Sequence, residues 1–149
     1  MKRALLGMGF ALAASCGGSD NSGGAKNLNN FQGGAWNGSI STTVNCPGSA
    51  PQTTPSSFAV AFSPGNGADL QYTSQAGCTF KFNVSGNTAS LSNAPVSCSA
   101  ASGGTTLTLS WSSYNVTTSD GHALNLTSAG NASDGAQTCS FTITGSATR

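Results

Sequence analysis

The chain has 149 residues, of which 37% are hydrophobic and only 6% are charged, with a formal net charge of +1 at pH 7. A charged fraction so far below the roughly 25% of ordinary globular proteins excludes the basic surface needed for nucleic-acid binding, and it leaves solubility to Ser, Thr, Asn and Gly residues. The length fits one domain with a core of its own.

The first 16 residues have the order of an export signal. Lys2 and Arg3 precede an apolar run over residues 4–12 that is too short to be a permanent membrane span, and small residues come after it. The stretch Ala13-Ala14-Ser15-Cys16 resembles the lipobox of bacterial lipoproteins, although Ala13 stands where that family most often has leucine. The resemblance implies cleavage before Cys16 and lipidation of its thiol. An ordinary secretory signal cut near the same place is the alternative.

The signal peptide is thus expected over residues 1–15, and the rest of the chain divides into two parts. Residues 16–30 begin with the lipidated Cys16, are rich in Gly, Ser and Asn, and predict a flexible tether to a β-barrel domain over residues 31–149. The lipoprotein resemblance implies a membrane partner through the lipid anchor in the bacterial cell envelope. Gly17, where retained inner-membrane lipoproteins commonly have aspartate, implies an outer-membrane address.

From Phe31 onward, apolar and polar residues alternate with period two, and no stretch has helical periodicity. This pattern predicts an all-β, antiparallel fold in which one face of each strand is buried. Tight-turn sequences at residues 85–87 and 119–122 separate successive strands. Eight short strands are expected, near residues 36–44, 58–62, 70–73, 79–84, 89–91, 107–116, 124–126 and 141–143.

Cys46, Cys78, Cys98 and Cys139 form an even set in an exported chain, which predicts two disulfides. Their spacing is too wide for a zinc site, so no metal is expected. In an eight-stranded up-and-down meander, neighbouring strands would pair Cys78 with Cys98, and closure of the first strand against the last would pair Cys46 with Cys139. This arrangement favours a small closed barrel over the alternative, a two-sheet β-sandwich.

The segment Gly34-Ala35-Trp36 resembles the Gly-x-Trp that opens the first strand of lipocalin-like (calycin) barrels. Those barrels also tend to place a basic residue near the end of the last strand over this tryptophan. The resemblance therefore implies a cation–π contact between Arg149 and Trp36. It is confined to these positions and to the number of strands.

Residues suited to catalysis are few. His122 is the single histidine, and it shares one hairpin turn with Ser119 and Asp120, where three side chains cannot easily align as nucleophile, base and orienting group. The chain has no glutamate, and Asp69 and Asp134 also lie in turn-like sequences. These observations predict that the protein is not an enzyme and uses no cofactor.

The expected function is therefore a structural or interaction role for a membrane-anchored module whose inward aromatic side chains fill a mostly closed core. Two alternatives stay open. One is an envelope hydrolase or inhibitor. The other is a lipocalin-like binder of a small apolar ligand, with a cavity lined by Phe58, Phe62, Phe80, Phe82, Trp111 and Phe141.

Overall fold

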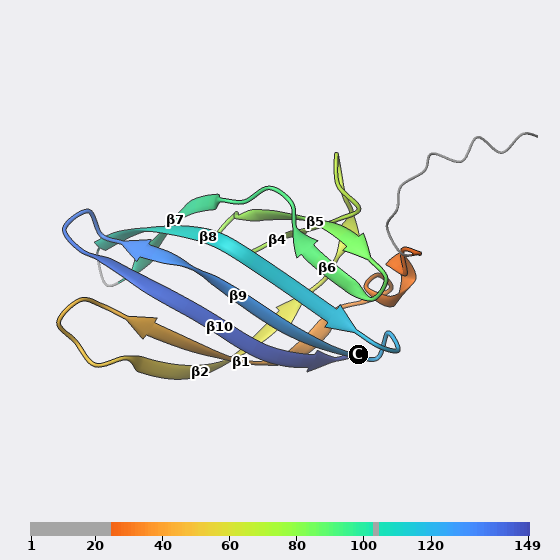
Figure 1. Cartoon of the computed structure of the whole chain (residues 1–149), viewed down its shortest axis with the longest axis horizontal. Coiled ribbons are helices and arrows are strands. Elements are labelled where there is room, and N and C mark those ends of the chain that lie inside the picture. Colours follow the sequence, from red (N-terminus) through yellow and green to blue (C-terminus); the bar gives the residue numbers. More distant parts are fainter. Residues whose placement is uncertain (1–24, 103–104) are drawn as a thin grey trace, which may run out of the picture.

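The fold is one curled antiparallel sheet, described by a computed structural model over residues 25–102 and 105–149 (Figure 1). Within these residues, a 3-10 helix, η1 (Leu28–Asn30), precedes ten strands. The strands are β1 (Trp36–Asn45), β2 (Gln52–Val60), β3 (Ser63–Pro64), β4 (Leu70–Thr73), β5 (Thr79–Ser85), β6 (Thr88–Leu91), β7 (Val96–Ser102), β8 (Thr105–Thr118), β9 (Ala123–Ser133) and β10 (Thr138–Thr148).

The all-β antiparallel class is confirmed, whereas the predicted number of eight strands is wrong. The two additional strands are β3, which has only two residues, and β7. β7 was not predicted because it is mostly Ser and Ala and has a single strongly apolar residue, Val96. Segments of this composition have weak strand propensity, and pairing with β8 holds β7 in the sheet.

The strands have the order β2-β1-β10-β9-β8-β6-β5-β4-β3. The expected pairing of the first strand with the last is confirmed, because β1 pairs antiparallel with β10, with Val44 opposite Phe141. β8 is long enough to pair with two strands, β7 and β6, along the same edge, while β9 pairs along its other edge. Val96 of β7 lies opposite Trp111 in its first half, and Thr88 of β6 lies opposite Thr117 in its second half.

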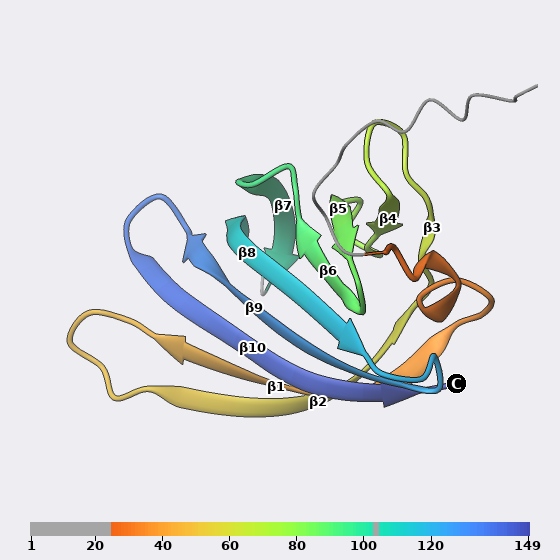
Figure 2. The same ribbon diagram turned by 45° about the vertical axis from the view of Figure 1, so that its right-hand side comes forward.

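The sheet is an open half-barrel, which corrects the prediction of a closed barrel (Figure 2). β2 and β3 stand at the two ends of the strand order and do not pair with each other. Residues 52–57 of β2 are all exposed and include no large apolar side chain. A strand of this composition gains little from packing across the sheet, so one end of the half-barrel stays splayed.

The described residues contain two disulfides, and these are the two pairs expected from the meander. Cys46, which comes directly after β1, is bonded to Cys139 in β10, with their Cα atoms 4.3 Å apart. Cys78, which precedes β5, is bonded to Cys98 in β7, with a Cα separation of 5.7 Å. The first bridge closes a loop of 93 residues and the second a loop of 20.

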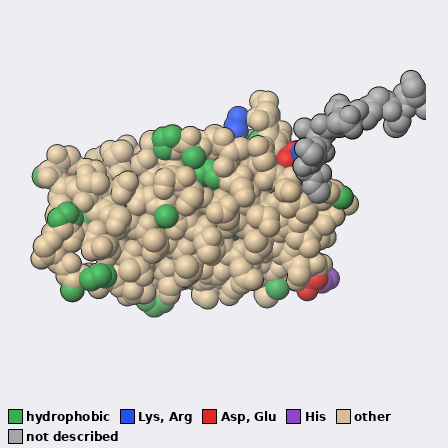
Figure 3. Space-filling view, viewed as in Figure 1, with side chains coloured by type: hydrophobic (Ala, Val, Ile, Leu, Met, Phe, Trp, Pro, Cys, Tyr) green, Lys and Arg blue, Asp and Glu red, His purple; other side chains and the backbone are tan. Residues whose placement is uncertain are grey.

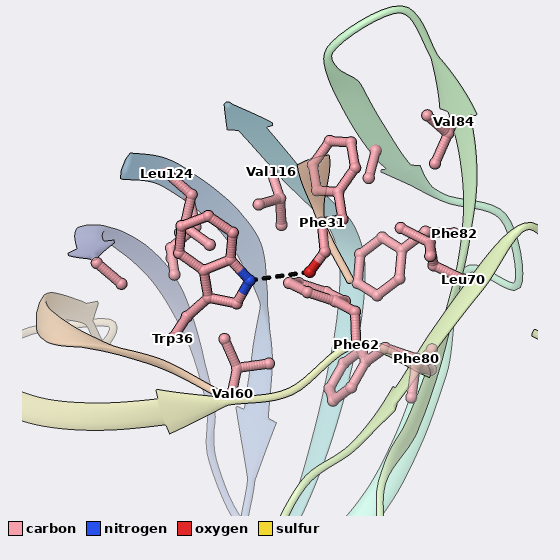
Figure 4. Close-up of a cluster of buried hydrophobic side chains, with 14 of the residues drawn as sticks. Phe31, Trp36, Val60, Phe62, Leu70, Phe80, Phe82, Val84, Val116 and Leu124 are labelled. Carbon is pink, nitrogen blue, oxygen red and sulfur yellow. Dashed lines mark hydrogen bonds between the residues drawn. The ribbon is translucent and has the colours of Figure 1, made fainter. Parts of the chain in front are cut away.

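The core fills the other end of the half-barrel, where η1 and β3 to β6 curl over the concave face (Figure 2), and Figure 4 shows its buried side chains. Aromatic rings dominate it. Phe62 makes edge-to-face contacts with Phe31 at 6.2 Å and with Phe82 at 5.7 Å between ring centroids. The largest fully buried side chains are Phe31, Trp36, Leu70, Phe82, Val116 and Leu124.

Arg149 and Trp36 lock this end of the sheet. The guanidinium lies 4.3 Å from the centroid of the Trp36 ring, so the expected cation–π contact is present. Its Nε donates to the Gly121 carbonyl oxygen at 2.7 Å, and its Nη2 donates to the Asn29 carbonyl oxygen at 3.2 Å. The indole Nε1 of Trp36 donates to the Phe31 carbonyl oxygen at 2.9 Å (Figure 4). The last residue thus joins η1 and the β8–β9 hairpin to the sheet.

Residues 26–30, which lie in the segment predicted as a tether, contact the sheet in the structure. Lys26 forms an ion pair with Asp69 at 2.8 Å, and the backbone N–H of Asn27 donates to the Gly86 carbonyl oxygen at 3.2 Å. Leu28 packs against the core and supplies the apolar anchor of this segment. The predicted signal peptide and Cys16 lie outside the described residues.

The outer face of the half-barrel is polar, as the alternation predicted. Cross-strand register places Ser57, Ser39, Ser146, Asn125 and Thr117 side by side over β2, β1, β10, β9 and β8. In Figure 3, apolar side chains are scattered over the pictured face and do not gather into one patch. Hydroxyl and amide groups therefore meet the solvent on this sheet face, in keeping with the low charge of the chain.

Candidate functional site: an apolar groove on the concave face

A groove of about 390 Å³ lies on the concave face at the splayed end of the half-barrel. Its volume falls within the range of roughly 300–1,000 Å³ that is typical of small-molecule sites. Most of its lining is apolar. The lining residues are Thr42, Val44, Leu107, Leu109, Trp111, Ala132, Asp134, Gln137, Cys139, Phe141 and Ile143.

Strand alternation brings these side chains to one face. Cys139, Phe141 and Ile143 are every second residue of β10, and Leu107, Leu109 and Trp111 are every second residue of β8. Between them runs β9, where Ala132 lies opposite both Leu109 and Cys139. A small side chain at this position leaves the groove open between two apolar walls.

An aromatic pair separates the groove from the core. Phe141 and Trp111 both lie opposite Gly130 of β9, and their rings meet edge to face with a centroid distance of 5.4 Å. A Cβ atom on Gly130 would collide first with the backbone carbonyl oxygen of Ser110 in β8 and would also lie 2.7 Å from Cζ of Phe141, so the close approach of β8 and this ring both require glycine. Trp111 also contacts the buried ring of Phe80 at 5.1 Å. This pair therefore stands between the groove and the aromatic core.

The hairpin between β9 and β10 forms the rim. Oδ1 of Asp134 accepts hydrogen bonds from the backbone N–H groups of Ala136 at 2.9 Å and Gln137 at 2.8 Å. These bonds, with that of Gln137 the stronger influence, hold the pKa of the exposed carboxyl below its ordinary value. Nε2 of Gln137 donates to the Pro47 carbonyl oxygen at 3.2 Å, next to the Cys46–Cys139 disulfide. The rim is thereby fixed to the end of β1.

The six aromatic residues that were predicted to line a ligand cavity lie in two different parts of the structure. Trp111 and Phe141 line the groove, although only 6% of Phe141 is exposed, whereas Phe62, Phe80 and Phe82 belong to the buried core cluster. Phe58 is partly buried against the core. The division follows from position in the fold, because Phe80 and Phe82 belong to β5 and Phe62 directly precedes β3, at the end of the half-barrel that the core fills.

Four aliphatic residues line the groove that were not among those predicted, namely Val44, Leu107, Leu109 and Ile143. All four belong to the inward rows of their predicted strands, so alternation could have identified them as candidates. Aromatic residues alone were predicted to line a cavity. In a closed core, the aliphatic side chains of this row would have been covered.

The hairpin that contains Ser119, Asp120 and His122 is a turn, as the sequence predicted. Oδ1 of Asp120 accepts the backbone N–H groups of His122 at 2.9 Å and Ala123 at 3.1 Å. These bonds, that of His122 first, lower the pKa of the Asp120 carboxyl. The carboxylate is engaged in holding the turn and not in orienting the imidazole.

Metal ligands do not gather in the part of the chain that the structure describes. Among residues 25–102 and 105–149, no three His, Cys, Asp or Glu side chains lie closely enough together to hold a metal ion. Over the same residues, no helix has the length and apolar character to cross a membrane.

Comparison with protein-family models, with curated proteins and with solved structures finds no match to this chain.

Proposed function

We propose that this domain is a non-catalytic binding module that holds the apolar part of a small molecule in the concave groove. The observation that carries the proposal is the groove itself, which is lined mainly by apolar residues, has a volume of about 390 Å³ and lies on a face that the sheet leaves uncovered. A stable protein interface needs about 800 Å² on each partner and is usually flatter. The concave shape and limited volume suit a small molecule better.

The apolar walls supply the driving force for binding. Leu107, Leu109, Trp111 and Ile143 are only partly buried, although each belongs to the inward row of its strand. A ligand that covers them removes apolar surface from water and gains about 25 cal/mol for each Å² so buried. The partly buried ring of Trp111, which packs against Phe141, adds a rigid surface against which a ligand can stack.

The groove lining favours binding over catalysis. Asp134 is the residue of the lining that can titrate, because Cys139 is held in a disulfide. General acid–base catalysis of a covalent reaction needs a positioned acid or base beside the reacting group. The Asp134 carboxylate lies at the rim and already accepts two backbone N–H groups through Oδ1. These features support a carrier or sensor of an apolar ligand rather than a hydrolase.

Filling the groove is expected to abolish binding. We expect the fluorescent probe N-phenyl-1-naphthylamine to bind the wild-type protein saturably in the micromolar range. Ala132→Phe, which places a ring between Leu109 and Cys139, should raise the dissociation constant at least about tenfold, equivalent to about 1.4 kcal/mol. Asn131→Phe is the matched control, because it places the same ring at the neighbouring exposed position of β9. Equal binding by all three proteins would contradict the proposal.

We also propose that the chain is exported and anchored by lipid on Cys16, with the groove presented at the cell envelope. The support is the resemblance of Ala13-Ala14-Ser15-Cys16 to a lipobox after an apolar run. Growth with labelled palmitate should label the wild-type protein and the Ser15→Ala control, and Cys16→Ala should abolish the label. Label that persists in Cys16→Ala would refute the anchor and leave the groove proposal untouched.

A further inference from the structure

The charge distribution around the groove is one-sided. Asp134 is the one charged residue in its lining. The three cationic side chains of residues 25–102 and 105–149 have partners elsewhere. Lys26 pairs with Asp69 at 2.8 Å, Nζ of Lys81 donates to the Asn66 carbonyl oxygen at 2.7 Å, and Arg149 donates to carbonyl oxygens around η1. The field at the groove rim is therefore negative, because no described cation offsets the Asp134 carboxylate there.

The rim presents hydrogen-bond acceptors to a ligand. Oδ1 of Asp134 accepts both hydrogen bonds from the backbone N–H groups, which leaves Oδ2 of the same carboxylate for a donor on the ligand. Gln137 uses its Nε2 to donate to the Pro47 carbonyl oxygen, so its amide oxygen is the group left for a ligand. The backbone bonds also fix the Asp134 carboxylate in place, which lowers the entropy lost when a head group binds.

The apolar part of the groove is elongated. The row from Cys139 to Ile143 spans five residues of β10, and its four rises cover about 14 Å at the usual rise of a strand. It starts beside the rim hairpin and ends beyond the aromatic pair of Phe141 and Trp111. A ligand lying along this row would have one end beside Asp134 and would extend past the aromatic pair toward Ile143.

We propose that the ligand is an amphiphile with a linear alkyl tail and a protonated amine head, the tail lying along the apolar row and the amine donating to Asp134. This inference rests on the proposed function and narrows it to one class of ligand. An anionic amphiphile such as a fatty acid is disfavoured, because its carboxylate would meet the Asp134 carboxylate without a cation to separate them. An amine head gains a charge-assisted hydrogen bond in the same position.

The test uses three probes that share a dodecyl tail, namely dodecylamine, dodecanol and dodecanoate, each titrated into the full-length protein below its micellar concentration. We expect dodecylamine to bind about tenfold more tightly than dodecanoate, with dodecanol between them. In Asp134→Asn, the amide oxygen still accepts the two backbone N–H groups and the turn is kept. The preference for the amine should then fall below about threefold, and dodecanol affinity should stay the same.

Asp120→Asn is the matched control. Asp120 makes the same pair of backbone hydrogen bonds through Oδ1 in the hairpin between β8 and β9, and its substitution changes the net charge equally. Because Asp120 does not line the groove, the amine preference should remain at its wild-type value. Loss of the preference in Asp120→Asn would indicate an effect of overall charge and would overturn the role of Asp134.

The outcomes separate the two proposals. Dodecanol binding that Ala132→Phe removes, without an amine preference or without an effect of Asp134→Asn, would overturn the inference on the head group and keep the binding function. Failure of all three probes to bind would overturn both. Concentration-dependent dimerisation in sedimentation, abolished by Ala132→Phe, would identify a second copy of the chain as the occupant and would also overturn both.

Discussion

Trp36→Ala is expected to lower the free energy of unfolding by about 3–5 kcal/mol, the range for removing a buried large aromatic side chain. Trp36 has no exposed surface, and its loss would leave a cavity below the Arg149 guanidinium. The Phe31 carbonyl oxygen would also lose the indole donor at 2.9 Å. Chemical denaturation monitored by circular dichroism measures the change, because removal of one of the two tryptophans would complicate a fluorescence signal.

Two variants separate the parts of this effect. Trp36→Phe keeps an aromatic ring below Arg149 and removes the indole N–H, so we expect a smaller loss than in Trp36→Ala. Arg149→Met in both the wild-type and Trp36→Ala backgrounds forms a double-mutant cycle, which should give a coupling energy of about 0.5–2 kcal/mol for the stacked pair. A loss of unfolding free energy below about 1 kcal/mol for Trp36→Ala would show that this end of the sheet does not depend on the contact between Arg149 and Trp36.

The second large effect concerns the disulfides. Replacing Cys46 and Cys139 together by serine is expected to cost about 4.6 kcal/mol, and replacing Cys78 and Cys98 about 3.3 kcal/mol, according to the chain-entropy relation. The difference arises because the first bridge closes a loop of 93 residues and the second a loop of 20. Denaturant unfolding of both double variants under identical conditions provides the comparison. The reverse order would contradict the entropic account for this chain.

The Cys46–Cys139 bridge has a second expected consequence, because it lies at the groove rim. Without it, the β9–β10 hairpin would be held to the segment after β1 through weaker links such as the hydrogen bond from Gln137 to the Pro47 carbonyl oxygen. We therefore expect the Cys46/Cys139 double serine variant to bind the naphthylamine probe more weakly, in the same titration, than the Cys78/Cys98 double serine variant. Equal dissociation constants for the two variants, both shown to be folded by circular dichroism, would contradict this role of the bridge.

Period-two alternation and the positions of the cysteines in the meander were enough to predict much of this fold. They placed Trp36, Leu109 and Phe141 on inward rows, and they led to the pairing of the first strand with the last and to both disulfide pairs. These features arise from local pattern and from the covalent order of a meander. They do not require knowledge of what lies across the barrel.

The open end of the sheet was beyond reach of the same reasoning. The sequence of Leu107, Leu109 and Trp111 would be the same whether these side chains packed against an opposite strand or lined an open groove. Alternation identifies only which face of a strand is apolar. The difference lies in β2, whose residues 52–57 contribute no large apolar side chain to an opposite wall. The sequence signal for the groove is therefore the lack of large apolar residues in this part of β2 that could cover the inward row of β8.

Residues 26–30 illustrate a different limit. Their Asn-rich composition resembles a linker, and composition was the basis for assigning them to a tether. In the structure, long-range contacts hold them, including the pair of Lys26 with Asp69, 43 positions apart in the chain. Contacts of this kind have no signature within the segment itself.

The exposed strand β2 also bears on how copies of the protein behave when they are close together. It stands at one end of the sheet with only β1 beside it, and such an edge can recruit a strand from another molecule. Pro55, opposite Ser41 of β1, lacks a backbone N–H, and proline on an edge strand is one of the features that disfavour pairing with another chain. If the chain is confined to a membrane surface, crowding there would favour edge-to-edge aggregation, and one proline in the middle of β2 would act against it.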